Sequence, residues 1–110
     1  MIKIKSILPS LREKKRYMVF EISKGNADME TSLKAIDHEL RKFLGEIGYG
    51  KAGIMMVETK DNKAIMKVNH KHVDEARLAL SLVKDINHEK VAIRTLGVSG
   101  ILKKAKEKWL

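Results

Sequence analysis

The sequence LPSLREKKRYMVFEI, residues 8–22, joins a basic segment directly to a strand that decides the fold. Pro9 excludes the start of this stretch from a helix interior or a central strand, because proline fixes φ and has no backbone N–H. From Tyr17 onward the side chains alternate with a period of two, so that Met18 and Phe20 share one face. The stretch therefore predicts a cationic arm that is anchored to the first strand of a hydrophobic core.

The length and composition fit one small intracellular domain. At 110 residues the chain can bury its own core, and its lack of cysteine excludes a disulfide scaffold and a zinc site with cysteine ligands. No apolar run approaches the roughly 20 residues that a membrane-spanning helix needs. The N-terminal segment is too short and too often interrupted by lysine for a signal peptide. We therefore expect a cytoplasmic protein.

The excess positive charge lies at the two ends of the sequence. The net charge is +9; residues 1–16 hold six bases and one acid, and residues 101–110 hold four bases and one acid. The 84 residues between them hold 13 bases and 12 acids. This segregation favours binding to a polyanion, with solubilising tails as the alternative. A membrane surface is a poorer partner, because the basic arm has no apolar face.

Turn signals and hydrophobic periodicity predict the order β-α-β-β-α-β, followed by a C-terminal helix. Asp28 is the expected N-cap of the first helix, and Gly45 is its expected stop. Residues 53–60 and 63–69 are typical of two strands that are joined by a tight turn. The remaining elements are a helix over residues 72–86, a strand over 90–98 and a basic helix over 101–110. This order predicts an α+β, ferredoxin-like (RRM-like) sandwich with a four-stranded antiparallel sheet and an extra C-terminal helix.

The helices carry the apolar side chains that packing on a sheet requires. The stripe of the first helix recurs at steps of four and three residues and consists of Met29, Leu33, Ile36, Leu40 and Phe43. Gly48, Gly50 and Gly53 then predict a loose loop. In the last helix, Trp109 is the side chain that we expect to hold the helix to the body. We divide the chain into an N-terminal arm (1–15), a ferredoxin-like domain (16–100) and a C-terminal helix (101–110).

Both faces of the predicted sheet are apolar, since the first two strands carry apolar side chains on both sides. Such a sheet requires cover on both faces. We expect another subunit, a second copy of this chain or the C-terminal helix on the face that the two main helices leave open. The third strand, KAIMKVN, also lacks the aromatic residues on which many RNA-binding domains of this fold stack bases.

No set of residues in the sequence predicts catalysis or metal binding. His70 and His72 form an HxH pair without an acidic residue at ligand spacing, which favours a helix entry over a metal site. The carboxylates are scattered among bases, and Ser99 lies in VSGI rather than in GxSxG. The glycines do not form a GxxxxGK[ST] phosphate loop. We therefore expect no catalytic residue, no metal site and no cofactor on the protein.

Several stretches together resemble the archaeal and eukaryotic ribonuclease P protein subunit family known as component 2. In chain order they are Leu8-Pro9, Leu11-Arg12, KKRY at 14–17, Leu44-Gly45-Glu46, Gly48, Arg77, Leu80, RTLGVSG at 94–100, and Lys103. They span nearly the whole chain. The RTLGVSG run and the LREKKRY arm are the most specific of them when taken together.

The resemblance implies a non-catalytic subunit of an endoribonuclease in which RNA does the chemistry. The RNA subunit of that enzyme performs the Mg²⁺-dependent hydrolysis that removes the 5′ leader from precursor tRNA. The implied partners are the ribonuclease P RNA, whose catalytic domain the protein would brace, a TIM-barrel-like protein subunit, and a second copy of this chain within a heterotetramer. The residues that we expect to contact RNA are Arg12, Lys14, Lys15, Arg16, Lys67, Arg94, Lys103, Lys104 and Lys106.

Two of these cations have alternative partners in the sequence. Lys67 and Arg94 lie in strands, where Glu58 or Glu21 could pair with them instead. Lys67 and His70 also stand where arginine is expected in the family, and Ile101 stands where threonine is common. Two other functions stay open on the residues alone. One is a regulatory or scaffold module that binds protein or a small ligand, and the other is an acylphosphatase-like hydrolase.

Overall fold

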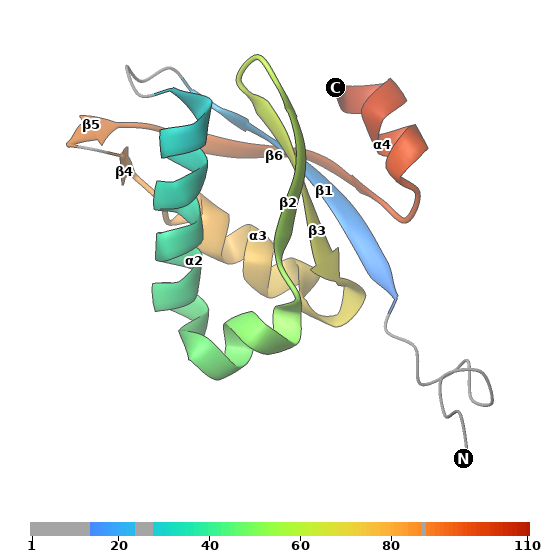
Figure 1. Ribbon diagram of the computed structural model, residues 1–110, viewed down its shortest axis with the longest axis horizontal. Coiled ribbons are helices and arrows are strands. Elements are labelled where there is room, and N and C mark those ends of the chain that lie inside the picture. Colours follow the sequence, from blue (N-terminus) through green and yellow to red (C-terminus); the bar gives the residue numbers. More distant parts are fainter. Residues whose placement is uncertain (1–13, 24–27, 87) are drawn as a thin grey trace.

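The computed structural model describes residues 14–23, 28–86 and 88–110. Its elements in chain order are β1 (Lys15–Ile22), α2 (Met29–Ala52), β2 (Met55–Lys60), β3 (Lys63–Asn69), the 3₁₀ helix η2 (His70–His72), α3 (Val73–Ser81), β4 (Asp85–Ile86), β5 (Glu89–Lys90), β6 (Ile93–Ser99) and α4 (Leu102–Trp109) (Figure 1). The main sheet has the order β2-β3-β1-β6, and every neighbouring pair is antiparallel. The predicted ferredoxin-like fold with a C-terminal helix is confirmed.

The alternation that we predicted for β1 separates the two faces of the sheet. Met18 and Phe20 are fully buried on the face that α2 and α3 cover, where Ile36 and Leu40 of α2 join the same core. Val19 is fully buried on the opposite face. Burying one such side chain contributes about 1.5–3 kcal/mol, and β1 also buries Ile22.

The second face of the sheet is covered in part by α4 (Figure 1). Val19 and Ile65 are fully buried beneath Ala105 of this helix. We expected another subunit, a second copy of this chain or the C-terminal helix on this face. The structure shows the C-terminal helix there. Met55 and Val57 on the edge strand β2 stay exposed.

The prediction that Gly45 ends the first helix is wrong. Gly45 has non-helical angles (φ 75°, ψ 166°) and kinks α2, but the helix continues to Ala52 and ends at Gly53 (φ 60°). The expected glycine loop is therefore mostly helical. Phe43, which we placed in the core stripe, is 53% exposed, because it lies just before this kink.

Two other boundaries also differ from the prediction. The second main helix ends at Ser81 rather than at residue 86. The Leu82 N–H donates to Ala79 O and the Val83 N–H donates to Leu80 O, each at 3.2 Å, and these bonds close the last turn. Residues 85–90 contribute the short strands β4 and β5 instead, and the last strand of the main sheet begins at Ile93. The hydrophobic periodicity predicted a longer helix because Val83 and Ile86 are both buried. They are buried in the segment that leads into and forms β4, not in a helix.

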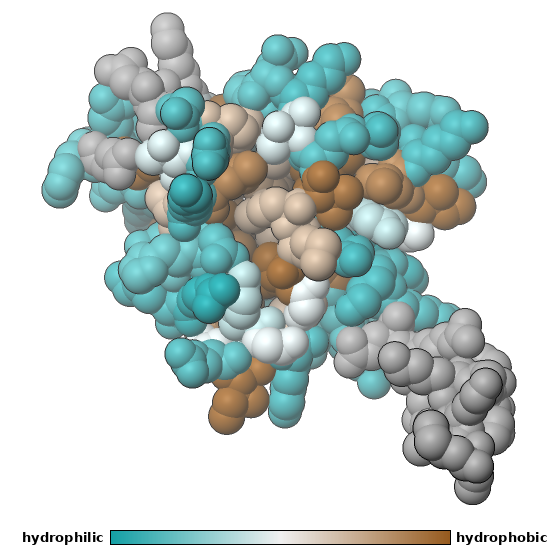
Figure 2. Space-filling model, in the orientation of Figure 1, coloured by the Kyte–Doolittle hydropathy of each residue, from teal (hydrophilic) through white to brown (hydrophobic). Residues whose placement is uncertain are grey.

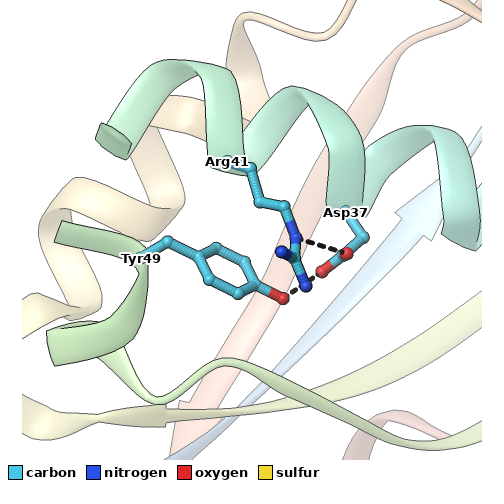
Figure 3. A network of polar contacts seen from close by, with 3 residues as sticks. All are labelled: Asp37, Arg41 and Tyr49. Atoms are coloured by element: carbon cyan, nitrogen blue, oxygen red, sulfur yellow. Dashed lines mark hydrogen bonds and ion pairs between the residues drawn. The ribbon is translucent and has the colours of Figure 1, made fainter. Parts of the chain in front are cut away.

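A polar network holds the two parts of α2 together across the kink (Figure 3). Tyr49 Oη donates a hydrogen bond to Asp37 Oδ1, and Arg41 Nε donates to Asp37 Oδ2 at 3.2 Å. The Arg41 guanidinium also lies 4.4 Å from the centre of the Tyr49 ring, within cation–π range. Burial and the hydrogen bond to Asp37 raise the pKa of Tyr49 above its ordinary value. The network explains why the turn after Gly45 stays helical.

We expect Tyr49→Phe to lower the free energy of unfolding by about 0.5–1 kcal/mol, because it removes one hydrogen bond to a carboxylate. Urea unfolding measures this difference. Since the folded state raises the pKa of Tyr49, the tyrosine stabilises the fold fully below the ordinary pKa of tyrosine, and this contribution is lost as pH rises through the raised value. The two proteins should therefore converge in stability above pH ~10. A constant difference would contradict the assigned contact.

Candidate nucleic-acid interface

The antiparallel sheet brings several predicted cations to one end of the molecule. The start of β1 lies beside the end of β3, where Lys15 is paired with Asn69, and beside the end of β6, where Tyr17 is paired with Ser99. The helix α4 begins just after β6 at this same end (Figure 1). Cations that are far apart in the sequence therefore share one region, which we call the basic end.

The basic end also contains two lysines that we did not predict to contact RNA. Lys51 lies in the last turn of α2, and Lys71 follows β3 in η2; both are exposed. The pairing of Lys15 with Asn69 places Lys71 beside β1, and the approach of Lys15 to Gly53 places Lys51 there. The members of the basic end are Lys14, Lys15, Arg16, Lys51, Lys67, Lys71 and Lys103.

Local contacts orient the β1 cations of the basic end. The Lys15 ammonium lies 3.1 Å from the position that a Cβ would take on Gly53, at the C-terminal end of α2, where the helix dipole favours a cation. Arg16 Nη1 donates to Lys15 O at 3.1 Å and lies 3.4 Å from the Cβ position of Gly100, ahead of α4. Both side chains are half-buried, so an incoming phosphate would meet cations that the fold already holds in place.

The backbone before β1 is held as well. The His70 N–H donates to Lys14 O at 2.8 Å, and the His70 ring Nδ1 lies 3.3 Å from the same oxygen. Thus His70 fixes the point from which the N-terminal arm enters the sheet. Arg12, the remaining cation predicted for the arm, lies outside the described residues.

Two predicted cations are engaged by carboxylates elsewhere. Arg94 Nη2 lies 3.1 Å from Glu21 Oε1 at the far end of β1, as we considered from the sequence. Lys106 Nζ lies 3.1 Å from Glu58 Oε2. A phosphate would have to compete with these carboxylates for the two cations. We therefore do not count Arg94 and Lys106 as members of the basic end.

The other predicted residues keep positions suited to contact with a partner. Lys67 lies between Tyr17 on β1 and Met55 on β2, on the sheet face that α4 covers in part. Lys103 and Lys104 are exposed in the first turn of α4.

His70 and His72, the HxH pair, each contact another residue of the chain. His72 Nδ1 lies 3.5 Å from Glu75 Oε1 in the first turn of α3, and His70 faces Lys14 O. Over the described ranges, no group of three or more histidine, cysteine or acidic residues is arranged to hold a metal ion. None of the helices in these ranges has the length and apolarity to cross a membrane.

The chain is similar to known proteins over nearly its whole length. The model of the Rpp14/Pop5 family matches residues 16–110. The chain is 40% identical to ribonuclease P protein component 2 of Thermococcus gammatolerans, over 98% of this chain and 92% of that protein. It is 35% identical to the Pyrococcus abyssi protein of the same name, over 99% and 95%.

The fold is also shared with a solved structure. A chain of the cryo-EM structure of yeast ribonuclease MRP superposes with a TM-score of 0.65 and 17% sequence identity, over 88% of this chain and 92% of that one. At this identity the likeness shows the common fold. The family model that matches most of the chain and the relatives of 35–40% identity confirm the resemblance that we identified from the RTLGVSG and LREKKRY motifs: this chain belongs to the Rpp14/Pop5 family.

Proposed function

We propose that this chain is a protein subunit of ribonuclease P and braces the catalytic domain of the RNA subunit during removal of the 5′ leader from precursor tRNA. The basic end is the observation that carries the proposal, because the fold gathers cations from β1, β3, η2, α2 and α4 in one region. Contacts to phosphates fix the position of a protein on RNA without reading its sequence. The hydrolysis and its Mg²⁺ ions belong to the RNA in this account, and the protein contributes positive charge and binds no cofactor.

The protein partners that we propose are a TIM-barrel-like subunit and a second copy of this chain, in a heterotetramer. Apolar side chains that stay exposed support such contacts. They are Phe43 and Ile47 beside the α2 kink, Met55 and Val57 on β2, Leu78 and Leu82 at α3, and Ile101 before α4. Figure 2 shows hydrophobic side chains gathered over β2 and at the bend of α2. The lack of cysteine suits the cytoplasm, where we place the complex.

Purification of the tagged chain from its native cell at low salt tests this function. We expect ribonuclease P RNA to be enriched, together with a TIM-barrel-like protein and untagged copies of this chain. Sequencing of the retained RNA and mass spectrometry of the proteins identify them. Recovery of proteins or a small ligand without RNA would instead support a scaffold or regulatory module.

A further inference from the structure

The helix α4 has one side that packs on the sheet and one that faces outward. Leu102, Ala105 and Trp109 follow a helical spacing and pack against Val19 and Ile65. The exposed charged residues on the outward side are Lys103, Lys104, Glu107 and Lys108. An isolated helix of eight residues is not stable in water, so α4 depends on its docking for its helical form.

The docking contact of α4 requires a glycine in β6. A Cβ on Gly97 would lie 2.0 Å from Cζ2 and 2.3 Å from Cε2 of the Trp109 ring, far inside contact distance. Among the described glycines, Gly45 and Gly53 have positive φ and Gly97 does not, so the backbone conformation would accept another residue there. The close approach of the ring is thus what makes Gly97 necessary.

A second contact fixes the middle of the helix. Lys106 Nζ reaches Glu58 Oε2 on β2 at 3.1 Å. Within the helix itself, Lys108 Nζ lies 5.1 Å from the centre of the Trp109 ring, in cation–π range. The turn before α4 lies against Arg16, whose Nη1 is 3.4 Å from the Cβ position of Gly100. With its C-terminal part, its middle and its preceding turn all held, α4 presents its first turn at the basic end.

We propose that Trp109 is a positioning residue for RNA binding. By packing on Gly97 it holds α4 in the orientation in which Lys103 and Lys104 extend the basic end, so that they contact phosphates without first being ordered. This inference rests on the proposed RNA-binding function. It goes beyond that function in assigning a role to an apolar side chain that need not touch RNA.

A double-mutant cycle tests the role of Trp109. The paired change Lys103→Gln and Lys104→Gln is made in the wild type and in Trp109→Ala, and binding to ribonuclease P RNA transcribed in vitro is titrated against salt. In the wild type we expect the pair to weaken binding about tenfold and to reduce the salt slope by roughly 1.5 to 2 units. In Trp109→Ala the same pair should cost less than about threefold, because the lysines are no longer held. Trp109→Phe, which keeps an aromatic ring, should restore most of the wild-type response.

Gly97→Ala supplies a second background that retains the chain's one tryptophan as a reporter. Its added methyl should displace the ring, so Trp109 fluorescence should shift to the red and become more accessible to acrylamide. The cycle repeated in this background should again show a reduced effect of the lysine pair. Unchanged emission in Gly97→Ala, or equal losses from the lysine pair in all backgrounds, would overturn the inference. If the wild type itself does not bind the RNA, the proposed function fails instead.

Discussion

Replacing Lys14, Arg16 and Lys103 together by glutamine is expected to weaken binding to ribonuclease P RNA about 100-fold at 0.15 M salt. Each of these cations would neutralise one backbone phosphate, and the counterions released by such contacts dominate the affinity of proteins for nucleic acid. The three residues come from the chain before β1, from β1 and from α4, so the change removes charge from the whole basic end. A filter-binding or fluorescence-anisotropy titration measures the loss.

The matched control removes the same charge from another part of the molecule. Lys60, Lys84 and Lys90 are exposed and lie away from the start of β1: Lys60 ends β2, Lys84 precedes β4 and Lys90 is in β5. Their replacement by glutamine should weaken binding less than about threefold. Equal losses in the two variants would mean that net charge, rather than the basic end, determines the affinity. Both variants should keep the wild-type melting temperature.

The second large effect concerns stability. Phe20→Ala is expected to lower the free energy of unfolding by about 3–5 kcal/mol, because Phe20 is fully buried between the sheet and the helices and its removal leaves a cavity. A domain of this size has about 5–15 kcal/mol of stability, so the variant should be close to unfolding at 37 °C. Urea denaturation followed by circular dichroism measures the change.

The other phenylalanine of the chain provides the comparison. Phe43 is 53% exposed, so Phe43→Ala should cost less than about 0.5 kcal/mol in the isolated protein. If Phe43 contacts a partner, as we propose, the same variant should bind that partner less tightly at unchanged stability. A loss of stability similar to that of Phe20→Ala would contradict the burial of the two side chains in this structure.

The fold could be predicted from the sequence where a local pattern and the tertiary packing agree. The alternation around Met18 and Phe20 identified the central strand, and Asp61-Asn62 identified the β2–β3 turn, where Asp61 has a positive φ of 55°. The end of the first helix could not be predicted from the glycine at position 45. The contact of Tyr49 with Asp37, twelve residues away, favours continued helix, and this contact depends on the kink itself.

The candidate site, like the fold, could be predicted from the sequence only in part. The sequence placed positive charge at the two ends of the chain. Only the pairing of β1 with β3 and the approach of Lys15 to Gly53 at the end of α2 show that Lys71 and Lys51 accompany it. The sequence offered Glu58 or Glu21 as alternative partners for the strand cations, and the strand register selects the pairing of Arg94 with Glu21. The prediction that Trp109 holds the last helix to the body is confirmed.

The salt dependence of binding tests the central claim most directly. The affinity of the full-length chain for ribonuclease P RNA is measured from 50 to 500 mM salt. If about five cations contact phosphates, the logarithm of the affinity should fall against the logarithm of the salt concentration with a slope of roughly −3.5 to −4.5. A slope near zero would contradict the claim that the chain braces RNA through its cations.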